Sequence, residues 1–254
     1  MFLMKWKISL SNNIKLGVLR KELKFFVNKN QLSLLRKKIL PFTSLDFNCK
    51  SVNNDYVVRS LYFDNIYDKN LDEKLDGILS REKIRIRSYK KNDLFKLEFK
   101  KRYNSLIQKD SYLINKNLAN NLSSNRFLYD SFFSYPNELD KAVAKMRVQG
   151  LFPRIVVEYD REAYIHNHGN TRITIDKNLR YLMPNNFMSS KLNAVPIFND
   201  NHTILEVKFT NYLPKAIKDA LQGINAISHS ISKYVHCQKF TDFNHTRDPI
   251  NIPF

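Results

Sequence analysis

The segment REKIRIRSY (81–89), followed by FKLEFKKR (95–102), carries the pattern that decides the fold. In the first segment Lys83, Arg85 and Arg87 alternate with isoleucines. Successive side chains of a β-strand point to opposite sides of the sheet, so this alternation predicts a strand with one basic face and one apolar face.

Four further segments repeat this alternation of charged and apolar residues. Their charged positions are Lys96, Glu98 and Lys100; Arg20, Glu22 and Lys24; Arg172, Thr174 and Asp176; and Glu206 and Lys208. Any one of them could be an ordinary half-buried strand with a solvated face. Like charges on neighbouring strands repel, however, so five such strands together favour faces that curl inward around a bound anion. The apolar faces would then lie outward beneath helices.

Hydrophobic periodicity predicts about eight strands and several helices. The expected strands are 19–26, 56–64, 82–90, 94–102, 108–114, 154–165, 171–176 and 203–210. The expected helices are 29–40, 66–75, 137–149, 214–227 and 230–240. The polar segments 115–136 and 183–200 indicate loops or short helices.

The overall charge points to a polyanionic partner. The 254 residues include 42 Lys and Arg against 24 Asp and Glu, which gives a formal net charge of +18. Nucleic acid, an acidic membrane and polyphosphate all meet this description. Two distant cysteines indicate a reducing compartment and give no support for a zinc site.

We expect a single domain over residues 1–254, with a core at about 18–240 and a polar tail at 241–254. The opening MFLMKWKISLSNN lacks the features of a signal peptide, and no window approaches the roughly 18 apolar residues of a membrane span. The expected location is therefore the cytoplasm, and any membrane link would come through a partner protein. The sequence does not decide the oligomeric state.

The charged strand faces suit a triphosphate. Arginine offers a planar fork to phosphate oxygens and lysine a compact point charge. Mg²⁺ or Mn²⁺ joins one or two carboxylates to substrate phosphates, and Glu22, Glu98 and Glu206 are the candidate ligands. Ser232, Lys233 and His236 on the predicted helix 230–240 would close one end of the binding tunnel.

The motifs, taken in order, resemble the VTC (vacuolar transporter chaperone) domain, also called the polyphosphate polymerase domain, of the triphosphate tunnel metalloenzyme (CYTH-like) superfamily. The chain is similar to the stand-alone bacterial members. The matching stretches are RKELKFFV (20–27), VRSLYFDN (58–65), YDKNLDEKLDG (67–77), REKIRIRSY (81–89), FKLEFKKR (95–102), RIVVEYDREAY (154–164), TRITID (171–176), ILEVKF (204–209) and SKYVHC (232–237).

The resemblance implies an α+β fold: an eight-stranded antiparallel β-barrel tunnel with a polar, basic lumen and helices packed outside. It implies an enzyme that uses Mn²⁺ or Mg²⁺ to transfer the γ-phosphoryl group of ATP to a growing inorganic polyphosphate chain, releasing ADP. The implied catalytic residues are Lys24, Arg85, Arg87, Lys100, Arg154 and Lys233, the substrate-binding residues Arg161, Arg172, Lys208 and Ser232, and the metal ligands Glu206, Glu22 and Glu98.

Two other functions remain open from the residues. Water in place of the acceptor phosphate would make the protein an inorganic triphosphatase or polyphosphate hydrolase. A non-catalytic module could bind polyphosphate or RNA. Nucleic acid is disfavoured because most aromatic residues of the basic strands fall on the apolar face, whereas RNA binding uses exposed aromatics.

Overall fold

The computed structural model describes residues 20–49, 51–89, 92–104, 106–126, 137–189, 193–198 and 202–246, with only the backbone of 92–93 and 242–246. Some expectations fall outside these ranges: those for the opening stretch 1–19, for residue 90, for residues 127–136, 190–192 and 199–200 of the polar segments, and for the tail beyond 246.

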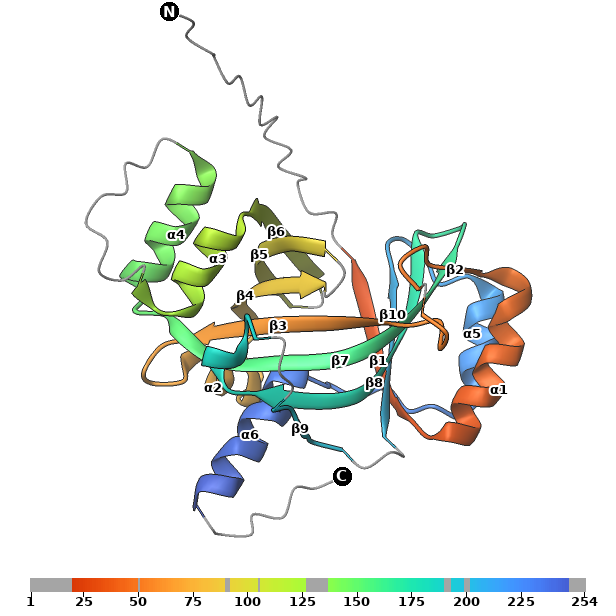
Figure 1. The fold of residues 1–254 in the computed structure, drawn as a ribbon. Helices are drawn as coiled ribbons and strands as arrows, with labels where there is room; N and C mark the ends of the chain where they lie inside the picture. Colours follow the sequence, from red (N-terminus) through yellow and green to blue (C-terminus); the bar gives the residue numbers. More distant parts are fainter. Residues whose placement is uncertain are drawn as a thin grey trace, which may run out of the picture.

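A large antiparallel sheet dominates the fold (Figure 1). Its eight longer strands are β1 (Lys21–Val27), β3 (Tyr56–Asp64), β4 (Ser80–Tyr89), β5 (Asn92–Tyr103), β6 (Leu106–Ile114), β7 (Phe152–His166), β8 (Thr171–Leu182) and β10 (Thr203–Phe209). Two-residue strands β2 (Ser44–Leu45) and β9 (Val195–Pro196) pair with β7 and β8. The predicted α+β class and antiparallel sheet are confirmed, with ten strands within the described residues.

Closure of the sheet into a barrel is not confirmed. The strand order is β1-β10-β8-β7-β3-β4-β5-β6, so β1 and β6 are its two ends. One isolated bridge, between Arg20 and Ile107, joins these ends. The edge of β1 that faces away from β10 pairs with another segment. Phe25 forms a β-bridge with Ser228, and the Lys24 carbonyl accepts a hydrogen bond from the His229 amide.

Six α-helices are described: α1 (Lys29–Ile39), α2 (Lys69–Leu75), α3 (Lys116–Ser123), α4 (Glu138–Val148), α5 (Lys215–Gln222) and α6 (Lys233–Thr246). Asparagine side chains cap the first turns of α1, α3 and α4. Short 3-10 turns cover Leu40–Phe42 and Pro184–Asn186. The predicted helix 230–240 begins at Lys233; residues 228–232 are not helical, and Ser228 pairs with Phe25 of β1. No helix in the described ranges is both long and apolar enough to cross a membrane.

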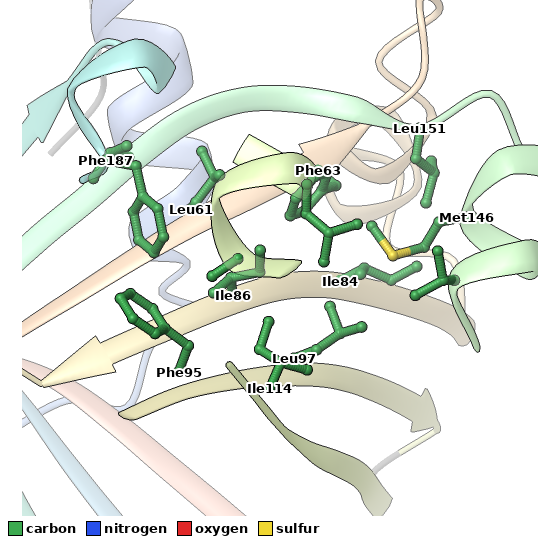
Figure 2. Close-up of a cluster of buried hydrophobic side chains, with 14 of the residues drawn as sticks. Leu61, Phe63, Ile84, Ile86, Phe95, Leu97, Ile114, Met146, Leu151 and Phe187 are labelled. Atoms are coloured by element: carbon green, nitrogen blue, oxygen red, sulfur yellow. The ribbon is translucent and has the colours of Figure 1, made fainter. Parts of the chain in front are cut away.

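The apolar strand faces are buried beneath helices, as the alternation predicts. Figure 2 shows Ile84 and Ile86 of β4 packed with Leu97 of β5 and Met146 of α4. At the other end of the sheet, α1 and α5 lie side by side and cover the apolar face of β1, β8 and β10 (Figure 1).

Helix α6 is an exception to the expectation that the helices pack outside. Its Tyr234 packs in a third core cluster that includes Tyr62 and Tyr159, and both of these tyrosines also line the cavity described below. One part of the charged side of the sheet is therefore covered by α6, and the remaining part stays open as the cavity.

Candidate functional site

A cavity of about 380 Å³ lies on the charged side of the sheet. Seven strands, helix α2 and the segment 228–233 contribute its walls. Eleven basic side chains line it: Lys24, Lys74, Arg81, Lys83, Arg85, Arg87, Lys100, Arg102, Arg161, Lys208 and Lys233. Two carboxylates, Glu22 and Glu206, accompany them. Such an excess of positive charge in a concave site creates a strong potential for an anion.

Strand β4 supplies a ladder of cations to one wall. Its alternation directs Arg81, Lys83, Arg85 and Arg87 into the cavity. Lys83 lies opposite Lys100 in the β4–β5 register. The basic faces predicted from the sequence are thus brought together by regular antiparallel pairing.

Strands β1 and β10 supply the two carboxylates. Glu22 pairs in register with Lys208, and Lys24 with Glu206. The Lys24 ammonium lies 3.5 Å from Glu22 Oε1 and 3.4 Å from Glu206 Oε1. Lys208 reaches Glu206 at 2.7 Å, and Lys100 crosses from β5 to Glu22 at 2.9 Å. Three lysines therefore share two carboxylates, which leaves net positive charge for a ligand.

Burial sets the protonation of these groups. It lowers the pKa of Lys24 to about 7, an effect that Glu22 opposes and neighbouring lysines increase. It lowers the pKa of Lys100 and of Lys208 to about 8 each. Burial alone would raise the pKa of Glu22, but Lys100, Lys24 and Lys208 outweigh it and hold that pKa well below its ordinary value. A bound anion would favour the charged lysines.

Glu98 lies behind the cavity wall, where it organises the two strand arginines. Its carboxylate is 1% exposed and lies 2.8 Å from Arg85 Nε, 3.8 Å from Arg87 Nε and 2.8 Å from Lys109 Nζ. Burial would raise the pKa of Glu98, but these three cations lower it well below the ordinary value. Glu98 therefore stays ionised and restricts the arginine rotamers.

Asp176 plays the same part for a second group of cations. Arg161 donates to both of its carboxylate oxygens at 2.6 and 2.8 Å, and the Lys233 ammonium lies 2.6 Å away. Tyr159 lies beneath both cations, with its ring centroid 5.1 Å from the Arg161 guanidinium carbon and 5.0 Å from Lys233 Nζ. The two cations are held at the cavity wall before any ligand binds.

The segment 228–233 lines the cavity and contacts both β1, through Ser228, and α2, through Ser230. Lys24 donates to the Ile231 carbonyl at 3.0 Å, and Lys83 donates to the Ser232 hydroxyl at 2.9 Å. His236, one turn further along α6, packs edge-on against Phe26 and Phe198 instead of lining the cavity. The segment is thereby tied to the strands that carry the cations.

The VTC domain is the family whose model matches this chain, over residues 19–241. The chain belongs to the VTC-domain family. This confirms the resemblance stated from the motifs. No match was found among proteins of curated function.

Two solved structures resemble this VTC domain. One is a Bacillus halodurans protein provisionally assigned as an adenylate cyclase, with a TM-score of 0.54 at 12% identity, covering 85% of this chain and 95% of that one. The other, a Vibrio parahaemolyticus protein with the same provisional assignment, has a TM-score of 0.48 at 11% identity, covering 87% and 98%. At 12% identity, the similarity to the Bacillus halodurans protein shows a shared fold and nothing about activity.

In this VTC domain, ten of the thirteen predicted site residues line the cavity. They are Lys24, Arg85, Arg87, Lys100, Lys233, Arg161, Lys208, Ser232, Glu206 and Glu22. Glu98 lies behind it. Arg154 instead pairs with Asp68 at 2.6 Å, and Arg172 with Asp46 at 2.7 Å. These two arginines are not among the cavity's lining residues.

Eleven of the lining residues were absent from the predicted site. Six of these eleven are lysines, arginines or tyrosines: Lys74, Arg81, Lys83, Arg102, Tyr62 and Tyr159. Arg81, Lys83 and Arg102 share strand parity with predicted residues, so that parity was a usable signal. Lys74 comes from helix α2, and no strand pattern could have placed it.

Two of the three candidate metal ligands lie together. Glu22 and Glu206 face the same cavity, and Glu22 Oε1 is buried without a hydrogen-bond partner. Glu98 does not join them, because Arg85, Arg87 and Lys109 occupy its carboxylate. Across the described residues, no group of three His, Cys, Asp or Glu could hold a metal ion. The pair fits a cation that takes its other ligands from a phosphate substrate and water.

Proposed function

We propose that this VTC-domain protein is a metal-dependent polyphosphate polymerase, which transfers the γ-phosphoryl group of ATP to inorganic polyphosphate and releases ADP. The observation that carries the proposal is the cavity lined by eleven basic side chains and two carboxylates. Phosphoryl transfer needs positioning and charge neutralisation more than a covalent nucleophile, and this lining supplies both.

The arginines would hold the phosphates in a fixed direction. Arg85, Arg87 and Arg161 are each restrained by a carboxylate behind the wall, so their forks meet the ligand with little loss of side-chain freedom. Lys24, Lys100, Lys208 and Lys233 would add point charges, while Ser232 would offer a hydroxyl. Arg154 and Arg172 lie outside this cavity, so the proposal gives them no ligand contact.

The reaction would be an in-line displacement at the γ-phosphorus. An oxygen of the terminal phosphate of the chain forms the new bond, and the bond from the γ-phosphorus to the bridging oxygen of ATP breaks. ADP leaves with that electron pair. The acceptor oxygen already carries negative charge, so it needs no strong general base.

Glu22 and Glu206 would hold Mn²⁺ or Mg²⁺ together with substrate phosphates. The ion would neutralise phosphate charge and so favour approach of the two anionic reactants. Lys24 and Lys208, which pair with these carboxylates in the free protein, would turn toward the phosphates. The proposal includes a cytoplasmic location, where ATP is available, and a membrane-protein partner as recipient of the product.

Product analysis tests this function. Purified protein would be incubated with ATP and Mn²⁺ or Mg²⁺, with polyphosphate resolved by gel and ADP by chromatography. Arg85→Ala and Glu206→Gln would be compared with matched controls on the outer face of the sheet. Arg36 and Glu162 suit this purpose, since they pair with one another at 2.5 Å and do not line the cavity.

Polyphosphate and ADP, lost in both cavity variants and retained in Arg36→Ala and Glu162→Gln, would support the polymerase. Orthophosphate without chains would instead identify an inorganic triphosphatase. Metal-independent binding of polyphosphate without turnover would identify a binding module and exclude the polymerase.

A further inference from the structure

A second cavity, of about 320 Å³, lies on the other side of the β4–β5 pair. Strand parity places it there, because Ser80, Glu82 and Ile84 of β4 line it, whereas Arg85 and Arg87 of the same strand line the cavity described above. Residues of β5, α2 and the end of α4 complete its walls. We call it the rim cavity, and the one described above the basic cavity.

The rim cavity and the basic cavity meet at the start of β4. Arg81 lines both of them, and its guanidinium donates to the Ile78 carbonyl. Helix α2 also contributes to both, with Lys74 in the basic cavity and Glu73 in the rim cavity. A single ligand can therefore occupy the two cavities by passing Arg81.

The charge of the rim cavity differs from that of the basic cavity. Four basic side chains and three carboxylates line it: Lys69, Arg81, Lys101, Lys145, Asp64, Glu73 and Glu82. Each of the three lysines already has a carboxylate partner: Lys69 has Glu73 at 3.8 Å, Lys101 has Asp110 at 2.9 Å, and Lys145 has Glu82 at 2.5 Å. The rim cavity therefore offers little attraction to a phosphate group and suits an uncharged polar group.

The polar lining of the rim cavity matches a sugar and the edge of a base. Glu82 Oε1 is buried and has no hydrogen-bond partner among the described residues, so it can accept from a ribose hydroxyl or an exocyclic amine. Three side-chain amides and a hydroxyl accompany it: Asn65, Asn70, Gln149 and Ser80. Amides both donate and accept hydrogen bonds, as the edges of nucleobases do.

The rim cavity also has apolar and aromatic surface for a flat ring. Ile84 and Leu151, which lie together in the hydrophobic core (Figure 2), give it an apolar floor. Tyr103 lines it with a side chain that is 48% exposed. Bases stack on exposed aromatic side chains of this kind. An apolar floor with a few polar groups is typical of a small-molecule site.

We infer that the rim cavity binds the nucleoside of the triphosphate donor, with Arg81 at the passage to the basic cavity. The inference rests on the proposed function, because it assumes that ATP is the donor. The charge of the basic cavity acts on any phosphate chain, whereas the rim cavity would let the protein distinguish a nucleoside triphosphate from a bare chain.

The test compares ATP with methyl triphosphate, which carries the same phosphates and charge without the nucleoside. Calorimetry without divalent metal would measure both affinities in the absence of turnover. The variants are Tyr103→Ala and Glu82→Gln. Tyr212→Ala is the control for the first, since Tyr212 is 57% exposed and lines neither cavity. Glu138→Gln is the control for the second, since Glu138 also pairs with a lysine, Lys141 at 2.8 Å, away from both cavities.

We expect the wild type to bind ATP about tenfold or more tightly than methyl triphosphate. Tyr103→Ala should lose about fivefold or more in ATP affinity, because it removes the stacking ring. Glu82→Gln should lose about threefold or more, because glutamine has one acceptor oxygen in place of two. Both variants should keep methyl triphosphate affinity within about twofold of the wild type, which also shows that they are folded. The two control variants should keep the wild-type ratio.

Equal affinity of the wild type for ATP and methyl triphosphate would overturn the nucleoside subsite and leave the proposed function standing. An unchanged ratio in both Tyr103→Ala and Glu82→Gln would overturn its placement in the rim cavity. Failure of the wild type to bind either ligand would overturn the proposed function, and the subsite with it.

Discussion

Replacing Asp176 by asparagine should separate what stabilises the fold from what binds the ligand. The Asp176 side chain is 0% exposed, lies behind the cavity and pairs with Arg161 at 2.6 Å and Lys233 at 2.6 Å. Burial would raise its pKa, but these two cations lower it. The carboxylate is therefore ionised at neutral pH, and its stabilisation is lost only as the pH falls through that lowered folded-state pKa.

The magnitude follows from the burial of this group. Breaking a buried ion pair by removing one partner costs about 3–5 kcal/mol, because it leaves uncompensated charge. Among the residues that the structure describes, Glu206, 3.7 Å away, is then the remaining carboxylate within ion-pair distance of Arg161. For a chain of this size the loss corresponds to a fall in Tm of roughly 6–20 °C.

Glu158→Gln is the matched control for this substitution. Glu158 is also 0% exposed and pairs with two arginines, Arg59 at 2.5 Å and Arg180 at 2.8 Å, but it does not line or back the cavity residues. Both variants should lose comparable stability. Only Asp176→Asn releases cations toward the cavity, so only that variant should gain affinity for tripolyphosphate at low salt.

Thermal unfolding with and without tripolyphosphate reads out both effects. At ligand about 100-fold above Kd the wild type should gain about 2.7 kcal/mol, and a tenfold tighter Kd in Asp176→Asn would add about 1.4 kcal/mol. Equal ligand shifts in the two variants, or a Tm loss under about 2 °C for Asp176→Asn, would refute the reasoning.

Three further outcomes are expected. Tripolyphosphate binding at pH 8 should take up protons, because the pKa of Lys24 is about 7 and that of Lys100 about 8 in the free protein. The affinity should therefore fall as the pH rises above 7, by up to about tenfold per pH unit for each lysine that is neutral before binding. Calorimetry in two buffers of different ionisation enthalpy measures the proton uptake, and an uptake of zero at pH 8 would contradict the assignment. Tyr62→Phe removes the hydroxyl that accepts from Arg85 at 2.9 Å, and should weaken ligand binding by about 1 kcal/mol with little change in Tm, which titration and melting curves check. Leu35→Ala, at a 0% exposed position on the buried face of α1, should cost about 2–5 kcal/mol of unfolding free energy in a denaturant titration and leave tripolyphosphate affinity unchanged.

Much of the site follows from strand parity, which the sequence shows directly. Alternation in β4, β5 and β10 places charge on one face and apolar residues on the other, and the structure confirms both faces at Arg85 with Ile86 and at Glu206 with Val207. Parity alone does not say how deep a side chain lies. Glu98 has the same parity as Lys100, yet it does not line the cavity, because Arg85 and Arg87 pair with its carboxylate.

Contacts between distant segments could not be predicted in this way. Lys74 reaches the cavity because α2 lies against β4, a packing that periodicity does not encode. Arg172 has the parity of the cavity residues, but its guanidinium pairs with Asp46, which is distant in the sequence, and does not line the cavity. Likewise, the burial of Tyr234 places α6 on the charged side of the sheet, whereas its sequence fits a helix on either side.

The junction between the two ends of the sheet has a consequence for how a polymer would reach the cavity. Within the described part of the chain, backbone pairing there is limited to the bridge between Arg20 and Ile107, and the ion pair between Lys100 and Glu22 is a side-chain link across it. A polyanion that attracts Lys100 would weaken that link at the moment it arrives. We therefore expect a long chain to enter sideways through the opened junction, so that chains blocked at both ends bind as fast as chains with free ends.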